Sequence, residues 1–170
     1  IGGRHLSGMK GTMLECGGLV PMIAHWPGKT PAGKVSADLI DSTDLLPTFA
    51  ELADSRLPKK SIFDGQSFAP QLRGETGKKR EWIYNQLAAM WYVRDAGWKL
   101  NEKGELYDMS GAPFTEKLVA APADTDASKA ARARLTAVLD QLNPAGGIPD
   151  TGDGTGRHAN RDRKKKTSRT

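Results

Sequence analysis

The feature that most constrains the fold of this chain is a series of short strand-like segments separated by turn-length gaps. The segments are EWIYNQL at 81–87, MWYVRDAGWKL at 90–100 and GELYDM at 104–109. They are rich in aromatic and β-branched residues, which favour strands. The turn formers Gly97 and Gly104 lie within the second segment and at the start of the third. We therefore predict three antiparallel strands in a meander, which form a small sheet.

A helical pattern follows the predicted sheet. The apolar residues that keep helical spacing are Ala131, Leu135, Val138, Leu139 and Leu142. The pattern predicts a helix between Ala127 and Leu142. Either Thr125 or Asp126 can cap its start, and Pro144 ends it. We expect this helix to cover one face of the sheet.

The first third of the chain has an α/β pattern. The apolar run LVPMIAHW at 19–26 is closed by a Pro-Gly turn, which predicts a buried strand. A helix is predicted from Asp44 to Ala53, with Thr43 as its N-cap and Pro47 in its first turn. One stripe of this helix would then pack on the strand. It consists of Leu45, Phe49 and Leu52.

Residues 54–81 are rich in turn-forming residues and lysines. This composition predicts a covered loop or a join between subdomains. The expected apolar anchors are Ile62, Phe63, Phe68 and Leu72.

The net charge of +5 is concentrated at the C-terminal end. After Leu142, seven Lys and Arg residues face three Asp residues, so the rest of the chain is nearly neutral. A folded nucleic-acid-binding face needs clustered basic residues with aromatic platforms, and the near-neutral charge of residues 1–142 argues against such a face. Residues 143–170 are Gly-rich and then basic, and we predict a disordered tail because they have almost nothing apolar to bury.

Several other classes are also disfavoured by the sequence. No apolar run approaches the roughly 20 residues of a membrane span. The chain has one cysteine, Cys16, so it forms no intramolecular disulfide. The histidines are scattered and none has a partner at metal-ligand spacing, so we predict no metal site built from this chain. They are His5, His25 and His158.

The stretch GMKGTMLECGGLVP at 8–21 holds the residues that carry candidate chemistry. Its four glycines predict a shaped loop rather than a long helix. Cys16 is interpreted as a small buried apolar residue rather than a nucleophile, since no neighbouring base marks it. For Lys10 two interpretations stay open on this basis: a solvated loop lysine, or a cation presented to an anionic ligand.

A series of motifs narrows these interpretations. In the first part of the chain they are Lys10-Gly11-Thr12, Glu15 with Gly17-Gly18, Val20-Pro21, Trp26-Pro27-Gly28 and Asp44-Leu45-Leu46-Pro47-Thr48. In the second part they are Asp64-Gly65 with Ser67, Tyr92-Val93-Arg94 with Trp98-Lys99-Leu100, and Glu105-Leu106-Tyr107-Asp108. Over residues 8–118 this series closely resembles the C-terminal half of the type I sulfatases, which share the alkaline-phosphatase-like fold.

The resemblance implies hydrolysis of sulfate esters, as in an arylsulfatase. In that family the nucleophile is a formylglycine made from a cysteine in a Cys-x-Pro-or-Ala-x-Arg motif. Its hydrate sits on a calcium ion, attacks the sulfur and expels the alcohol. Cys16 lacks that motif, so the nucleophile and the calcium ligands are expected before Ile1. This chain alone is expected to hold no calcium and to be inactive. Lys10 matches the lysine that contacts the substrate's sulfate, whereas Glu15 and Asp44 are assigned to bracing the loop and starting a helix.

The resulting expectation is an α/β fold. Residues 1–74 would be the C-terminal part of a large α/β catalytic domain, residues 75–142 a small antiparallel sheet with its helix, and residues 143–170 the tail. By the resemblance, the complete enzyme would take a sulfate-ester substrate and be periplasmic or extracellular. From charge and hydropathy we expect no membrane partner and no specific nucleic-acid partner. An alternative hypothesis is a non-catalytic module that binds polyanions through its basic tail.

Overall fold

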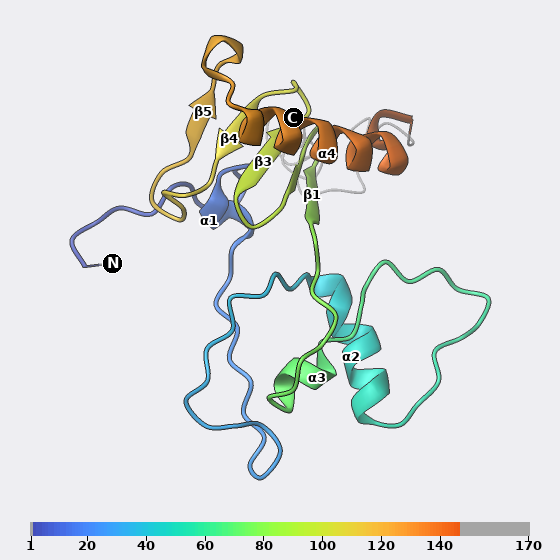
Figure 1. Ribbon diagram of the computed structural model, residues 1–170. Helices are drawn as coiled ribbons and strands as arrows, with labels where there is room; N and C mark the ends of the chain where they lie inside the picture. Colours follow the sequence, from blue (N-terminus) through green and yellow to red (C-terminus); the bar gives the residue numbers. More distant parts are fainter. Residues whose placement is uncertain (1, 147–170) are drawn as a thin grey trace, which may run out of the picture.

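The computed structural model describes residues 2–146, which form two lobes (Figure 1). The upper lobe in this view contains the antiparallel sheet, the helix that lies across it, and the one-turn helix α1 (Glu15–Gly18). The lower lobe contains α2 (Leu45–Leu52), α3 (Ala69–Leu72) and long loops. The chain is thus a mixed α/β structure.

The sheet is an antiparallel meander, as predicted. Its five strands lie in chain order: β1 (Ile83–Leu87), β2 (Met90–Arg94), β3 (Trp98–Asn101), β4 (Leu106–Asp108) and β5 (Lys117–Val119). The expected number of three strands was wrong. The Asp95 carboxylate accepts hydrogen bonds from the backbone N–H groups of Gly97 and Trp98, at 2.9 and 2.8 Å, and this turn divides residues 90–100 into two strands. The three-residue β5 was not predicted, because it is too short to show a pattern.

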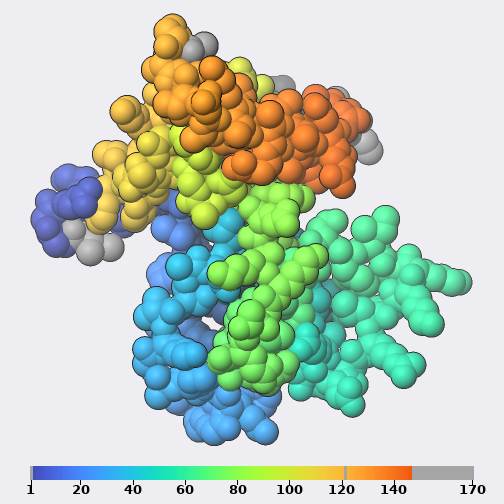
Figure 2. Space-filling view, in the orientation of Figure 1, coloured from blue at the N-terminus to red at the C-terminus, as the bar shows by residue number. Residues whose placement is uncertain are grey.

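The predicted C-terminal helix is confirmed as α4 (Asp126–Leu142). Thr125 is its N-cap, and the Thr125 Oγ1 accepts a hydrogen bond from the Ser128 N–H at 3.2 Å. The helix ends at Asn143, which takes the left-handed conformation with φ of 47°. Figure 2 shows α4, in orange, lying across the upper lobe.

The two faces of the sheet have opposite character. Successive side chains of a strand point to opposite faces. The apolar face packs against α4 and forms the core, which consists of Val93, Leu100 and Leu106 from the sheet and Ala131 and Leu135 from the helix. The alternate positions include Tyr92, Arg94 and Lys99, which are also buried. This second face is polar, and residues 13–18 contact it.

The predicted helix in the first third of the chain is present, but its cap differs. A 3-10 helix at Ser42–Asp44 leads directly into α2. Asp41 is the N-cap of the 3-10 helix and Asp44 that of α2, so Thr43 caps neither. The Asp41 carboxylate accepts from the Thr43 N–H at 2.8 Å, and the Asp44 carboxylate accepts from the Asp41 N–H at 2.9 Å. This reciprocal pair is a capping box, in which an Asp is as suitable as a Thr.

The predicted buried strand at 19–26 was wrong. These residues have no strand pairing, and Val20 and Ile23 are 75% and 92% exposed. A strand needs a neighbour to satisfy its backbone, and residues 2–146 provide none for this segment. For the same reason the expected packing of α2 on that strand is absent, and Phe49 is exposed.

Residues 54–81 contain an element that was not predicted, the one-turn helix α3 of the lower lobe. Of the expected anchors, Phe68 is buried, whereas Ile62 is 93% exposed and was wrongly assigned. A 3-10 turn at Pro144–Gly146 follows α4, and the rest of the predicted tail, 147–170, lies outside the described residues. Within the described part of the chain, no helix has the length and apolar character needed to cross a membrane.

Candidate functional site

Lys10 lies in a loop that is closed at its base. The Cys16 N–H donates to the Ser7 carbonyl at 2.9 Å, and the Ser7 N–H donates to the Pro113 carbonyl at 2.8 Å. Inside this closure, Met9 and Thr12 form a tight turn, in which the Thr12 N–H and Oγ1 donate to the Met9 carbonyl at 3.0 and 2.7 Å. Lys10 is therefore at the tip of a turn, and its side chain is exposed. Among residues 2–146 it has no hydrogen bond or ion pair.

Glycines shape this loop, as the sequence predicts. Gly8 has a φ of 93°, a conformation that residues with a Cβ rarely adopt. Gly17 approaches the backbone so closely that a Cβ there would lie 1.9 Å from the Thr12 carbonyl oxygen. The turn that carries Lys10 is thus packed directly onto α1.

A buried ion pair fixes the residues that follow the turn. Lys99 on β3 pairs with Glu116, and their side chains are 3% and 2% exposed. The Lys99 Nζ also donates to the Met13 carbonyl at 3.1 Å. The Glu116 Oε1 accepts from the Glu15 N–H at 2.5 Å. This one pair therefore binds two backbone groups of the loop, one on each side of Leu14.

A second buried pair lies beside the first. The Glu15 carboxylate pairs with Arg94 of β2, and both side chains are buried. The expected bracing role of Glu15 agrees with this contact. The Arg94 Nε donates to the Asp95 carbonyl at 3.0 Å, so the guanidinium is also held by the turn between β2 and β3.

Two tyrosines enclose the Lys99 ammonium. Its Nζ is 5.1 Å from the ring centroid of Tyr92 and 5.2 Å from that of Tyr107, which are distances at which a cation and an aromatic face attract. The Tyr107 hydroxyl donates to the Glu105 carboxylate at 3.0 Å. Burial, and then this hydrogen bond to an anion, raise the pKa of Tyr107 to about 12.

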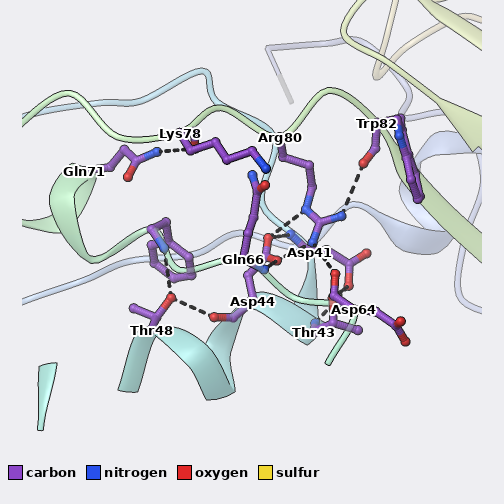
Figure 3. Close-up of polar contacts among 11 residues, drawn as sticks. Asp41, Thr43, Asp44, Thr48, Asp64, Gln66, Gln71, Lys78, Arg80 and Trp82 are labelled. Atoms are coloured by element: carbon purple, nitrogen blue, oxygen red, sulfur yellow. Dashed lines mark hydrogen bonds and ion pairs between the residues drawn. The ribbon is translucent and has the colours of Figure 1, made fainter. Parts of the chain in front are cut away.

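In the lower lobe, Asp44 is the centre of a separate polar cluster (Figure 3). The Arg80 Nε donates to the Asp44 Oδ2 at 2.9 Å, and the Gln66 N–H donates to its Oδ1 at 2.7 Å. Arg80 further donates to the carbonyls of Asp64 and Trp82. The cluster thus joins the start of α2, the loop at 64–67 and the segment that enters β1. This agrees with the structural role that the sequence assigns to Asp44.

The charge state of Asp44 follows from these contacts. Burial alone would raise the pKa of the carboxyl group. The Arg80 hydrogen bond, the N–H groups of Asp41 and Gln66, and the Arg80 charge outweigh it and lower the pKa below its ordinary value of 3.8. Asp44 is therefore ionised at neutral pH.

The remaining candidate residues hold no site of their own in the described part of the chain. Cys16 is a half-buried free thiol, and its sulfur donates to the Pro113 carbonyl at 3.9 Å. Among residues 2–146, no three His, Cys, Asp or Glu side chains gather where they could hold a metal ion. These residues therefore do not fit a calcium site, and the chemistry below uses none.

Sequence reasoning missed Arg94, Lys99 and Glu116. A signal for the first two is present: Arg94 and Lys99 each stand next to an apolar residue of their own strand, Val93 and Leu100, and therefore fall on the opposite face. Nothing local in the sequence shows that a loop 80 residues earlier covers that face. The basic residues on which the polyanion hypothesis depends lie in 147–170, outside the described residues.

Comparison with known proteins agrees with the resemblance. The family model described as N-sulphoglucosamine sulphohydrolase, C-terminal, matches residues 3–141. Human arylsulfatase D is 32% identical over 119 residues, covering 65% of this chain and 19% of that protein. The ulvan-active sulfatase of Formosa agariphila is 39% identical over 75 residues, covering 44% of this chain and 15% of its own. Mouse steryl-sulfatase is 33% identical over 98 residues, covering 54% of this chain and 16% of that protein.

This chain thus spans less than a fifth of the length of the curated relatives it matches. The family match, in contrast, covers most of the chain and includes both the Lys10 loop and the sheet. The chain therefore belongs to the sulfatase family whose model is N-sulphoglucosamine sulphohydrolase, C-terminal.

Proposed function

We propose that this chain is the C-terminal part of a sulfatase that hydrolyses sulfate esters to an alcohol and inorganic sulfate, and that Lys10 binds the sulfate group. Family membership supports the reaction class. The observation that carries the role of Lys10 is its position at the exposed tip of a closed loop, with no partner for its ammonium among residues 2–146.

The chemistry suits a single ammonium. As the S–O bond to the alcohol breaks, negative charge grows on the leaving oxygen while the other sulfate oxygens stay charged. A compact cation held in place beforehand stabilises that charge without reorganising, and such preorganised stabilisation is usually the largest contribution to catalysis. Lys10 would donate hydrogen bonds to these oxygens, which makes it both a substrate-binding and a catalytic residue.

The proposal is limited to sulfate esters as a class. The names of the relatives point to different substrates: one is an arylsulfatase, one an ulvan-active sulfatase and one a steryl-sulfatase. The polar loop and sheet described above do not distinguish among them. The nucleophile, a calcium ion and an export signal belong to the complete enzyme that the proposal implies, and none of the described residues is assigned to them.

Release of inorganic sulfate tests this function. The complete sulfatase polypeptide is expected to release sulfate from a chromogenic aryl sulfate, whereas the corresponding aryl phosphate serves as the control for ester specificity. The 170-residue chain alone is expected to release none. If the complete polypeptide hydrolysed the phosphate and not the sulfate, the proposed function would be wrong.

A further inference from the structure

Four buried charged side chains lie together at the polar face of the sheet, and their contacts meet at one short segment. They are Glu15, Arg94, Lys99 and Glu116. Each side chain is at most 10% exposed. Two are cations and two are anions, so the cluster is neutral. Its contacts converge on residues 13–15, immediately after the turn that carries Lys10.

Stability alone does not account for this arrangement. Burying a charge costs desolvation energy, and replacing a buried ion pair by apolar residues of similar volume is often neutral or stabilising. A buried ion pair does, however, require one geometry, because its hydrogen bonds are directional. Here that geometry includes the Met13 carbonyl and the Glu15 N–H, which are both held by the Lys99–Glu116 pair.

The segment so fixed is rigidly connected to Lys10. Met13 follows directly on the Met9–Thr12 turn, which is closed by three hydrogen bonds between these two residues. The Cys16 N–H and the Ser7 carbonyl close the loop on its other side. A shift of the Met13 backbone therefore moves the turn, and the Lys10 side chain moves with it.

We propose that Lys99 and Glu116 are positioning residues that set the place of Lys10 relative to the substrate's sulfate. This inference rests on the proposed function of Lys10. Neither residue touches the substrate, and both act through the backbone of residues 13–15. A misplacement of a catalytic group by about 1 Å can lower the rate on the order of 10²-fold. Loss of the pair is therefore expected to impair catalysis even in a protein that stays folded.

The test uses variants that separate positioning from folding. Lys99→Met alone leaves the Glu116 charge buried without a partner. The double variant Lys99→Met/Glu116→Gln removes both charges and keeps a side-chain oxygen that can accept from the Glu15 N–H. Lys103→Met is the matched control, because Lys103 is an exposed lysine in the turn after β3. Thermal unfolding of each variant reports whether it is folded.

The decisive readout is a double-mutant cycle in the complete sulfatase polypeptide. In the presence of Lys10, the double variant is expected to lower kcat/KM for an aryl sulfate by about 10-fold or more, mostly through kcat. In a Lys10→Ala background the same two changes are expected to cost almost nothing further. An equal loss in both backgrounds would overturn the inference and leave the proposed function standing.

A second readout uses the 170-residue chain itself and does not depend on activity. Amide hydrogen exchange in residues 8–15 is expected to be faster in the double variant than in wild type, whereas exchange in α4 is expected to stay the same. The control Lys103→Met is expected to exchange at the wild-type rate in both regions. Unchanged exchange in residues 8–15 would overturn the inference. If instead Lys10→Ala alone left kcat/KM unchanged, the proposed role of Lys10 would fail and the inference with it.

Discussion

Lys99 and Glu116 form an ion pair that is almost completely removed from solvent, with side chains 3% and 2% exposed. Lys99 comes from the centre of the sheet, and Glu116 immediately precedes its last strand. Together they hold a carbonyl and an N–H of a loop, through contacts that span 86 and 101 residues of the sequence. The sheet is thus more than a neighbour of the Lys10 loop, because it fixes the conformation of that loop.

The first prediction concerns the stability of this pair. Lys99→Met is expected to lower the free energy of unfolding by about 3–5 kcal/mol, because it leaves an uncompensated buried carboxylate. Adding Glu116→Gln removes that charge and is expected to recover most of the loss. Urea unfolding of the 170-residue chain at pH 7 measures both. A double variant less stable than Lys99→Met would contradict this account of the pair.

The second prediction is acid sensitivity from Asp44. The pKa of Asp44 is lowered in the folded state. The ionised carboxylate therefore stabilises the fold at pH values above the ordinary pKa of 3.8, and this stabilisation is lost as pH falls through the folded-state pKa. Asp44→Asn is expected to cost about 3–5 kcal/mol at pH 7, since it leaves Arg80 buried without a partner charge. The difference from wild type is expected to shrink below about pH 4.

The free energy of unfolding of wild type and of Asp44→Asn, measured between pH 2 and 7, tests this effect. Asp64→Asn is the control, because the Asp64 side chain is exposed and only its backbone carbonyl contacts Arg80. A difference between wild type and Asp44→Asn that stayed constant down to pH 2 would show that the Asp44 charge is not involved.

The third prediction concerns the close packing of α1. Gly17→Ala is expected to destabilise the chain or displace the loop, because the new Cβ would lie 1.9 Å from the Thr12 carbonyl oxygen. Gly97→Ala is the control, since the nearest atom to its Cβ is a carboxylate oxygen 4.0 Å away. Thermal unfolding of both variants measures the difference. Equal unfolding temperatures would mean that the turn carrying Lys10 is not packed on α1.

The fourth prediction is the ionisation of Tyr107. Burial and the hydrogen bond to Glu105 raise the pKa of Tyr107 to about 12, so this residue is expected to ionise at a higher pH than an ordinary tyrosine. Because the folded-state pKa is raised, the neutral phenol stabilises the fold below the ordinary pKa of 10. This stabilisation is lost as pH rises through about 12. Tyrosinate absorbance measures it, and Tyr107→Phe is expected to remove the component near pH 12. If that component stayed, it would belong to another tyrosine.

Local sequence patterns were sufficient for the elements that are stabilised by local or adjacent contacts. The helix α4 has a capping residue and an apolar stripe, and the meander follows from short gaps between strand-like segments. The predicted strand at 19–26 failed because pairing is not a local property: an apolar run satisfies the pattern whether or not a neighbouring strand is present.

The candidate site was predictable only in part, for a similar reason. Lys10 and Glu15 stand out because glycines surround them and because their motif resembles that of the sulfatases. The burial of Lys99 and Glu116 was not predictable in the same way, since a Lys or a Glu is usually solvated. Their burial arises from a contact between segments far apart in sequence.

The central claim is that Lys10 stabilises the charge of the sulfate group, and kcat/KM of Lys10→Ala in the complete sulfatase polypeptide tests it most directly. Lys29→Ala is the matched control, as Lys29 is another exposed lysine in a turn. We expect Lys10→Ala to lower kcat/KM for an aryl sulfate on the order of 10²-fold, as for loss of one oxyanion-stabilising donor. We expect Lys29→Ala to behave as wild type. An unchanged kcat/KM in Lys10→Ala would contradict the account.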